Sequence, residues 1–332
     1  MIISRTPLRM SFIGGGSDLP AFYREEPGAV LSTTIDKFVY VSVNPKFGGG
    51  IRLAYSRTEE VERLDQIQHR LFRAAFELLG VEGGVEVTTT ADIPSRGTGL
   101  GSSSTFTVGL LKVMAAYEGR DLPSSRLAQL ACEVEIDRCG EPIGKQDQYA
   151  AAFGGVNLFE FMPDDTVHVS PVIMRPEVRN RLEEEVLVFY TGRTRTASSI
   201  LAAQSQAVAD DIRVRRALRR MVELTYQMRD ELAEGRCEGV GAILDEGWSL
   251  KKTLSQGISD PDIDAWYAAA MKAGAAGGKL LGAGAGGFLM FMAPVDKHEE
   301  IARAVQLPRI RMGFSSTGSK IVFYNPSVGA LI

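Results

Sequence analysis

The most constraining feature of this sequence is a glycine-serine segment that lies between a strand pattern and a helix pattern. Val85, Val87 and Thr89 alternate with polar neighbours, as in a half-buried strand, and glycine then recurs at positions 97, 99 and 101. Apolar side chains follow at helical spacing up to Tyr117, which predicts a helix beginning near Ser103. Strand, glycine loop and helix in this order are typical of a phosphate site, where main-chain amides and the positive end of a helix hold an anion.

The glycine-serine segment differs from two commoner phosphate-binding motifs. A Walker loop requires lysine after its last glycine, where this chain has Ser102. The dinucleotide-binding pattern requires a third glycine where this chain has Ser104, so a nicotinamide cofactor is not expected. Taken alone, the segment leaves open a flexible turn with an N-capping serine. The predicted nucleotide-binding residues are Arg96, Gly97, Thr98, Gly99, Leu100, Gly101, Ser102, Ser103 and Ser104.

Length and element order predict an α+β protein of two domains. The chain has 332 residues, more than one hydrophobic core usually organises. Strand and helix patterns alternate without the regular cadence of a parallel α/β sheet. The pattern fades into a charged, turn-like segment near residues 171–181, so we expect domains at 1–175 and 176–332. A last strand, Lys320–Tyr324, is predicted to close the second domain.

Charge and cysteine content narrow the classes of partner. With 37 basic and 41 acidic residues the formal charge is -4, which supplies no large positive field for nucleic acid or anionic lipid. Three cysteines are too few for a disulfide framework and lack zinc-type spacing, which favours a reducing cytoplasm. The longest uncharged run, residues 280–295, is shorter than a membrane helix. We therefore expect a soluble cytoplasmic protein with small-molecule ligands and no nucleic-acid or membrane partner; a homodimer is left open.

Two further glycine-rich segments lie before and after the loop in the chain. Residues 7–18 bring Arg9, a triple glycine and the pair Ser17-Asp18 close together, and Asp18 can accept hydrogen bonds from two vicinal sugar hydroxyls. The alternative is that Asp18 caps the helix suggested by residues 19–24. Residues 282–287 contain four glycines, more than a compact turn needs, which indicates that backbone or ligand approaches closely there.

These three segments, in this order, resemble the motifs of the GHMP kinase superfamily, named for galactokinase, homoserine kinase, mevalonate kinase and phosphomevalonate kinase. The most diagnostic part is residues 97–104 with Pro94 before them, which is similar to the family's PxxxGLGSS segment. The resemblance covers nearly the whole chain and implies ATP-dependent phosphoryl transfer to an alcohol. It also implies an N-terminal domain like ribosomal protein S5 domain 2 and a ferredoxin-like C-terminal domain.

The resemblance assigns catalytic and metal-binding roles to individual residues. Asp147, in the GxxD segment, would accept or orient the proton of the attacking hydroxyl, with Arg9 beside it. Ser103 and Glu135 would supply oxygen ligands to Mg²⁺, the ion expected with ATP. Glu135 precedes Asp147 by twelve residues, one more than in mevalonate kinase, which leaves Glu133 as an alternative ligand.

Within the superfamily, the chain is most similar to the D-glycero-D-manno-heptose 7-phosphate kinases. The similarity rests on residues 7–20, on Tyr55-Ser56 and on residues 144–149. Galactokinases match less well, because they carry a Glu-His pair where this chain has Gly15-Gly16. The implied reaction phosphorylates the anomeric hydroxyl of the heptose 7-phosphate to give the 1,7-bisphosphate, a step toward nucleotide-activated heptose for bacterial surface polysaccharide such as capsule.

A sugar phosphate requires a second anion site, which we predict at residues 191–198. Two arginines, Arg193 and Arg195, converge there with several hydroxyls and a predicted helix start. Lys145 is a further candidate, and a surface turn with solvated arginines is the alternative. The predicted substrate-binding residues are Gly14, Gly15, Gly16, Ser17, Asp18, Lys145, Arg193, Arg195 and Gly284.

Two other functions stay open at this point. A fucokinase- or galactokinase-like enzyme would need no clamp for a second phosphate. A non-catalytic sensor of sugar and ATP would be expected to have lost the base or the metal ligands, whereas Asp147, Ser103 and Glu135 are all present. An active sugar kinase is therefore the expectation.

Overall fold

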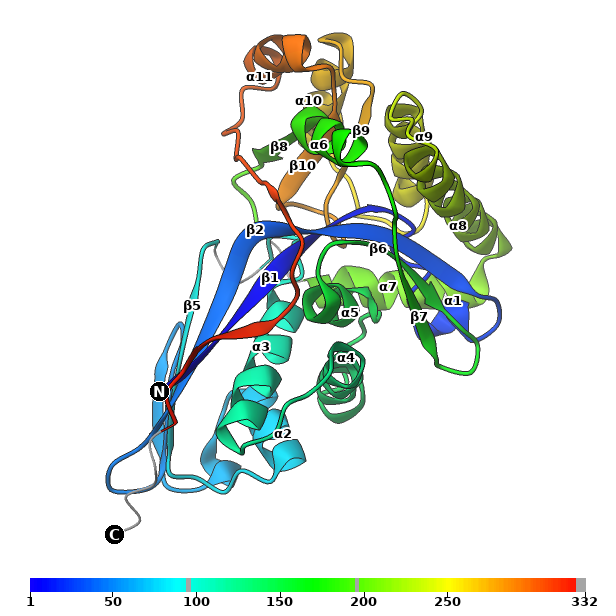
Figure 1. Cartoon of the computed structure of the whole chain (residues 1–332). Helices are drawn as coiled ribbons and strands as arrows, with labels where there is room; N and C mark the ends of the chain where they lie inside the picture. Colours follow the sequence, from blue (N-terminus) through cyan, green and yellow to red (C-terminus); the bar gives the residue numbers. More distant parts are fainter. Residues whose placement is uncertain (94–96, 195–196, 327–332) are drawn as a thin grey trace.

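A long antiparallel pair of strands, β1 (Ile2–Ile13) and β2 (Gly28–Pro45), runs through the centre of the molecule (Figure 1). The computed structural model describes residues 1–93, 97–194 and 197–326. The second half of β1 is buried on both faces, because helices cover the central pair from both sides. The pairing of β1 with β2 shifts register between Pro7 and Arg9 and again between Ser11 and Ile13. Such irregularities turn side chains away from the regular alternation, and both Arg9 and Ser11 face the cavity described below.

Further strands extend this pair into a large sheet. Within the described residues it has nine strands, and its main path runs β12-β1-β2-β5-β3-β4, with β6 and β11 also paired to β2 and β7 paired to β6. The added strands are β3 (Ile51–Ala54), β4 (Thr58–Val61), β5 (Val85–Ala91), β6 (Val156–Phe161), β7 (Val167–Pro171), β11 (Phe314–Ser315) and β12 (Lys320–Tyr324). All pairs are antiparallel except β3 with β5.

The last strand does not close the second domain as expected. In Figure 1 the chain returns from the upper part of the molecule to the large sheet, and β12 pairs with β1, Tyr324 lying opposite Ile2. The main-chain groups along this side of β1 would otherwise be left unpaired at a sheet edge. The predicted boundary near residue 175 falls in the link between β7 and the next helix, and as a domain boundary it stays a prediction.

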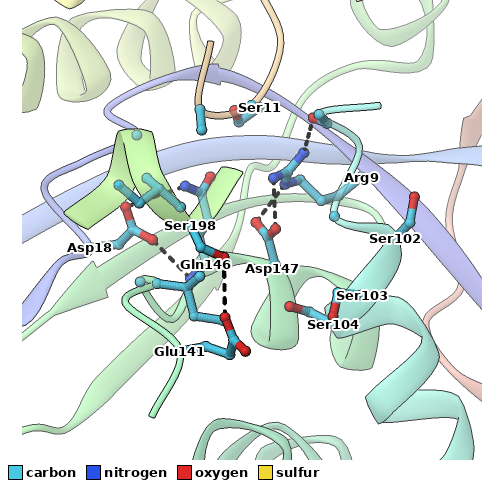
Figure 2. A pocket seen from close by; sticks show the side chains of 18 of the residues that line it. Arg9, Ser11, Asp18, Ser102, Ser103, Ser104, Glu141, Gln146, Asp147 and Ser198 are labelled. Carbon is cyan, nitrogen blue, oxygen red and sulfur yellow. Dashed lines mark hydrogen bonds and ion pairs between the residues drawn. The ribbon is translucent and has the colours of Figure 1, made fainter. Parts of the chain in front are cut away.

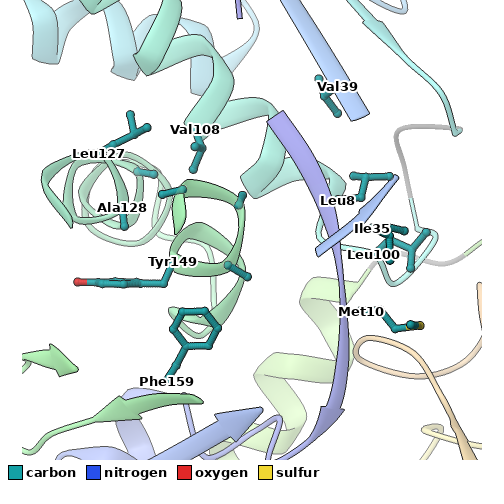
Figure 3. Packing of buried hydrophobic residues seen from close by; sticks show 14 of the residues in the cluster. Leu8, Met10, Ile35, Val39, Leu100, Val108, Leu127, Ala128, Tyr149 and Phe159 are labelled. Atoms are coloured by element: carbon teal, nitrogen blue, oxygen red, sulfur yellow. The ribbon is translucent and has the colours of Figure 1, made fainter. Parts of the chain in front are cut away.

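Among the described residues, four α-helices and a π-helix cover one face of the large sheet (Figure 1). They are α2 (Arg70–Leu79), α3 (Ser102–Tyr117), α4 (Ser124–Cys132), the π-helix Glu133–Arg138 and α5 (Gln146–Phe153); the short α1 (Pro20–Tyr23) lies apart. Figure 3 shows Val108 of α3, Leu127 of α4 and Tyr149 of α5 packed into the buried core between helices and strands. At Gly109, α3 approaches β1 closely, and the Ser4 hydroxyl donates to the Gly109 carbonyl at 2.8 Å. This packing fixes where the first turn of α3 lies.

The rest of the chain forms a three-stranded sheet covered by helices, seen at the top of Figure 1. Its strand order is β8 (Val186–Tyr190), β10 (Phe288–Met292) and β9 (Gly277–Leu280). Its helices are α6 (Pro176–Glu185), α8 (Ile212–Ala233), α9 (Val240–Lys252), α10 (Pro261–Lys272) and α11 (His298–Val305). A second apolar core lies here and includes Phe189, Phe291 and Trp248. The remaining helix, α7 (Ala197–Asp210), lies lower in Figure 1, beside α1.

The architecture confirms the predicted α+β class. The strand predicted at residues 85–89 is present as part of β5, and the helix after the glycine loop begins at Ser102. In the described part of the chain, no helix is both long and apolar enough to cross a membrane.

Candidate active site

Most of the predicted site residues meet at one cavity of about 590 Å³, where the three glycine segments come together (Figure 2). Its wall includes β1, the first turns of α3 and α5, and the glycine segment after β9. Segments separated by up to about 270 residues in the chain therefore contribute to one site. Charged and hydroxyl-bearing side chains line the cavity together with glycines and a few apolar residues.

The glycine loop adopts a backbone that places its amides at the cavity. Gly97, Gly99 and Gly101 all have positive φ, at 68°, 75° and 75°. Alternating left-handed residues bring successive N–H groups to one concave side, which suits an anion. The first α-helical bond of α3 runs from Thr105 N to Gly101 O, so the amides of residues 102–104 have no partner within the helix. The backbone itself therefore presents the unpaired amides that the predicted phosphate cradle requires.

The third glycine segment packs directly on this loop. A Cβ on Gly99 would overlap the Leu281 carbonyl, and a Cβ on Gly282 would overlap the Gly99 backbone. Similarly, a Cβ on Gly287 would overlap the Thr98 carbonyl. The close approach expected at residues 282–287 is therefore an approach of backbone to backbone. It brings the third glycine segment into direct contact with the glycine loop at the cavity.

Arg9 connects the loop to Asp147. Its Nε and Nη2 donate to the two Asp147 carboxylate oxygens, both at 2.7 Å, and its Nη1 donates to the Gly99 carbonyl at 2.7 Å (Figure 2). The Arg9 amide also donates to the Leu100 carbonyl at 3.1 Å. A bidentate pair of this kind fixes the orientation of the carboxylate. Gly101 leaves the room for it, since a Cβ there would lie 3.1 Å from Asp147 Oδ2.

Glu135, rather than Glu133, reaches the loop. Glu135 is fully buried in the π-helix, where its Oε1 accepts from Ser103 Oγ at 3.0 Å and its Oε2 from Gln148 Nε2 at 2.6 Å. Glu133 instead pairs with Arg138 at the surface. A π-turn holds one more residue than an α-turn, which moves later side chains around the axis. Burial raises the pKa of the Glu135 carboxyl to about 7, while hydrogen bonds from its hydroxyl and amide neighbours act in the opposite direction.

The pair Ser103 and Glu135 fits a magnesium ion. A hydroxyl and a carboxylate are hard oxygen ligands, and their two oxygens already lie 3.0 Å apart on the cavity wall. Among the described residues, no group of three acidic, histidine or cysteine side chains is arranged to enclose a metal. Magnesium is commonly held by one or two protein ligands together with substrate phosphates and water, so this sparse set is sufficient.

Asp18 is held in the cavity wall and does not cap a helix. The first turn of α1 begins after Leu19 without a side-chain cap, which excludes the alternative prediction. Asp18 Oδ1 accepts from Gly16 N at 2.8 Å and from Gln146 Nε2 at 3.3 Å. Burial raises the pKa of its carboxyl, and hydrogen bonds from main-chain amides oppose this shift. Gly144 permits the approach, because a Cβ there would overlap the Asp18 carboxylate.

Comparison with known proteins places this site in a family. Residues 67–155 match the GHMP kinases N terminal domain, and residues 228–308 match the GHMP kinases C terminal domain. A D-glycero-alpha-D-manno-heptose 7-phosphate kinase of Campylobacter jejuni is 30% identical over 317 residues, which cover 92% of this chain and 93% of that protein. The chain belongs to the GHMP kinases. It is therefore a sugar kinase, an enzyme that transfers a phosphoryl group to an alcohol.

Two further comparisons support this GHMP kinase assignment. The crystal structure of a D-glycero-D-manno-heptose 1-phosphate kinase from Bacteroides thetaiotaomicron superposes with a TM-score of 0.81 at 27% identity, covering 98% of this chain and 100% of that one. A galactokinase of Pyrococcus furiosus is 29% identical over 249 residues, or 67% of this chain and 68% of that protein. The expected two-domain GHMP kinase fold is confirmed by these matches.

Most of the predicted residues of this GHMP kinase do line the cavity. They are Arg9, Gly15, Gly16, Asp18, Gly97, Thr98, Gly99, Gly101, Ser102, Ser103, Ser104, Glu135 and Asp147. Three others support the wall from behind. Leu100 points its side chain into the core (Figure 3), Gly14 lies against the Ala29 carbonyl, and the Ser17 hydroxyl donates to the carbonyls of Gly14 and Ala29.

The predicted clamp for the sugar's own phosphate needs correction. Arg193 does not line the cavity: it pairs with Asp260 at 3.0 Å and with Asp262, and its guanidinium stacks on Trp266. Two carboxylates therefore already neutralise it. Arg195, the second arginine of the clamp, lies outside the described residues, as does Arg96 of the nucleotide set.

Two other predicted substrate contacts are also placed elsewhere. Lys145 points away from the cavity, where it pairs with Asp165 at 2.9 Å and lies over the Tyr23 ring. Gly284 packs against the backbone of Ile258, because a Cβ there would lie 2.7 Å from the Ile258 Cα. Its role is to allow a close approach between two chain segments, as at Gly282 and Gly287.

Several side chains that line the cavity were not predicted from the sequence. Gln146, Lys251 and Lys279 face it, together with Thr194 and Ser198. Gln146 stands next to Asp147 and could have been found from that position alone. Lys251 sits in a helix between Leu250 and Lys252, where no local pattern distinguishes it from a solvated lysine.

Proposed function

We propose that this GHMP kinase uses ATP to phosphorylate the anomeric hydroxyl of D-glycero-D-manno-heptose 7-phosphate, giving the 1,7-bisphosphate. The observation that carries the kinase chemistry is the bridge by which Arg9 joins the Asp147 carboxylate to the glycine loop. The heptose assignment is supported by relatives whose names carry a heptose phosphate. Those names differ in the position of the phosphate, 7 in one and 1 in the other, so the test below includes both acceptors.

The nucleotide phosphates would lie at the amino end of α3. The amides of residues 102–104 and the helix dipole there favour a polyanion even though the chain is acidic. A second hollow of about 540 Å³ shares Ser102 and Ser103 with the cavity and is lined by Tyr55, His69 and Phe106. Aromatic rings of this kind suit a nucleobase, so ATP would span the two hollows with its phosphates at the loop.

Phosphoryl transfer then requires the acceptor hydroxyl to lie between Asp147 and the γ-phosphate. The hydroxyl oxygen forms a bond to the γ-phosphorus while the bond from phosphorus to the bridging oxygen breaks, and ADP leaves with that electron pair. Asp147 takes the hydroxyl proton, or orients it during transfer, and Arg9 stabilises the negative charge that develops beside it. Magnesium, held by Ser103 and Glu135, would neutralise charge on the phosphate oxygens.

The sugar would lie over the first glycine segment. Gly15 and Gly16 leave this part of the wall without side chains, and Asp18 with Gln146 offers carboxylate and amide groups to sugar hydroxyls. Among the described residues, Gln146 Oε1 is buried without a hydrogen-bond partner. A sugar hydroxyl donating to it would satisfy this acceptor. The product would serve the synthesis of nucleotide-activated heptose for surface polysaccharide, in the cytoplasm.

A panel of acceptors tests the proposal. ADP release is measured with ATP and magnesium for heptose 7-phosphate, heptose 1-phosphate, free heptose, fucose and galactose, and ³¹P NMR identifies the position phosphorylated. We expect kcat/KM for heptose 7-phosphate to exceed that for the free sugars by at least about 100-fold. Preference for heptose 1-phosphate would mean that the enzyme phosphorylates a hydroxyl other than the anomeric one. Preference for fucose or galactose would favour a fucokinase- or galactokinase-like function instead. No turnover of any acceptor would support a non-catalytic sensor.

A further inference from the structure

Two buried lysines face the cavity without a role in the proposed chemistry. Lys251, in α9, and Lys279, in β9, are only 6% and 8% exposed, yet both contribute to the cavity wall. Lys251 Nζ donates to the Gly15 carbonyl and to Gln204 Oε1, both at 3.3 Å, and Lys279 Nζ donates to the Ser11 carbonyl at 2.9 Å. Both ammonium groups therefore reach from the second part of the chain to the first glycine segment.

The charge of this lysine pair is not balanced. In the described part of the protein, every hydrogen bond of either ammonium goes to a neutral oxygen, and neither forms an ion pair with a carboxylate. The neighbouring cation Arg9 is already matched by Asp147. Asp18 attracts Lys251 from a longer distance, but one carboxylate cannot neutralise two cations.

Retaining two cations in such a position is unfavourable without an anion. Burial, together with repulsion from Lys251 and Arg9, lowers the pKa of Lys279 to about 7. Burial also lowers the pKa of Lys251 to about 8, although Asp18 opposes the shift. Buried charges normally have a partner of opposite sign, so the arrangement is complementary to a ligand that brings negative charge.

A buried amide beside the lysines supports the same conclusion. Gln204 is fully buried; its Oε1 is occupied by Lys251, and its Nε2 lies against Gly16 without a hydrogen-bond partner among the described residues. The Gln204 Nε2 group and the ammonium groups of Lys251 and Lys279 are all hydrogen-bond donors, and the first of them has no acceptor. Such a set matches the oxygens of a phosphate, which accept hydrogen bonds.

We propose that Lys251 and Lys279 form the seat for a phosphate dianion, namely the phosphate that the acceptor sugar already carries. The inference rests on the proposed function, since it supplies the second anion site that a sugar-phosphate kinase requires and that Arg193 does not provide. The acceptor's phosphate is favoured over the γ-phosphate of ATP because both lysines contact the segment Ser11–Gly15, on the side of Asp18. The γ-phosphate is the other source of the same chemistry.

Binding measurements with single lysine variants test the seat. Lys251→Met and Lys279→Met remove the charges at similar side-chain length, while Lys252→Met removes a neighbouring charge that pairs with Asp264 outside the cavity. Isothermal titration follows heptose 7-phosphate, free heptose, ADP and a nonhydrolysable ATP analogue. In the first two variants we expect the dissociation constant of heptose 7-phosphate to rise by roughly 30-fold or more. The dissociation constants of the other three ligands should rise by less than about threefold. Lys252→Met should leave all four unchanged.

The other outcomes are equally informative. Weakened binding of the ATP analogue, with ADP and heptose 7-phosphate unaffected, would assign the seat to the γ-phosphate and overturn the acceptor assignment. Equal losses for free heptose and its phosphate, or no loss at all, would overturn the phosphate seat. Lys279→Arg, which keeps the charge, should retain most of the affinity, and circular dichroism of each variant shows whether it is folded.

Failure of the proposed function gives a different result. If the wild-type protein does not turn over a heptose phosphate, the same titration is run with the acceptor found by the panel and with inorganic phosphate. Protection of the wild type by inorganic phosphate against thermal unfolding, lost in Lys251→Met and Lys279→Met, would then retain the seat while the heptose is rejected. The absence of protection, together with unchanged binding of the panel's acceptor, would overturn the seat itself.

Discussion

Two walls of the active-site cavity offer positive charge by different physical means. The loop wall, residues 97–104 with the start of α3, presents main-chain amides whose partial charges belong to the fold and do not titrate. The lysine wall, Lys251 and Lys279, presents full charges on side chains that burial drives toward the neutral form. The loop wall should therefore act similarly at every pH, whereas the lysine wall should depend on pH and should lower the stability of the unliganded protein.

The largest effect is expected at Asp147, which Arg9 holds where the two walls meet. Asp147→Asn keeps the shape of the side chain but removes its ability to take a proton, so we expect kcat to fall by roughly 10²–10⁴-fold with ATP binding nearly unchanged. ADP release and titration with an ATP analogue measure the two quantities. Asp164→Asn, at an exposed carboxylate bonded to Thr166, is the matched control. A loss of less than tenfold would mean that Asp147 only positions the hydroxyl.

A smaller effect is expected when the loop wall is changed at its glycines. Gly99→Ala would strain a residue with φ of 75° and drive its Cβ into the Leu281 carbonyl, so we expect about 2–4 kcal/mol of destabilisation and weaker ATP binding. Gly119→Ala has a similar φ of 71° but open space around it, and should lower stability by only about 1 kcal/mol. Urea unfolding measures both. Equal losses would show that the contact with the third glycine segment contributes little.

The smallest effect concerns the lysine wall, where a substitution should stabilise the unliganded protein rather than destabilise it. In the folded protein Lys279 has a pKa of about 7, below its ordinary 10.5, so between these values the unfolded chain binds more protons and stability rises with pH. Lys279→Met removes this penalty and should stabilise the unliganded protein by roughly 2 kcal/mol near pH 6.5. The gain should shrink toward pH 10.

The pH series also contains its own control. Lys251, Arg9 and Asp18 face the same region and remain in the variant, so the difference from wild type isolates Lys279 and its coupling to them. Lys252→Met, at a lysine that pairs with Asp264 outside the cavity, is the matched surface control. A Lys279→Met difference that is flat between pH 6.5 and 10 would contradict a buried, unbalanced charge.

Local patterns were enough to predict the loop wall. Positive φ at every second residue requires glycine, a helix start leaves amides unpaired, and strand alternation shows where the preceding strand ends. The Asp147 and Ser103 positions followed from the family motifs. The choice between Glu133 and Glu135 could not be made from spacing, because a π-turn changes which side chain faces the loop.

The lysine wall and the clamp show where local patterns fail. Arg193 was expected to bind a phosphate. Its guanidinium instead pairs with Asp260 and Asp262, which lie about 70 residues further along the chain. Lys251 and Lys279 face the cavity because α9 packs against both β9 and β1, and a lone lysine within a helix or strand gives no sign of this.

By itself, the sequence determined the family, the α+β class, the strand-loop-helix unit and the residues whose function depends on backbone conformation. The strand, the loop and the helix are each determined by nearby residues, and the family and class follow from the order of such segments along the chain. Only the tertiary structure decided which charges are neutralised, which glutamate reaches the loop, and that the last strand returns to β1. Those outcomes depend on long-range packing, because the partner of a charge, or of a strand edge, is whatever the fold brings within a few ångströms.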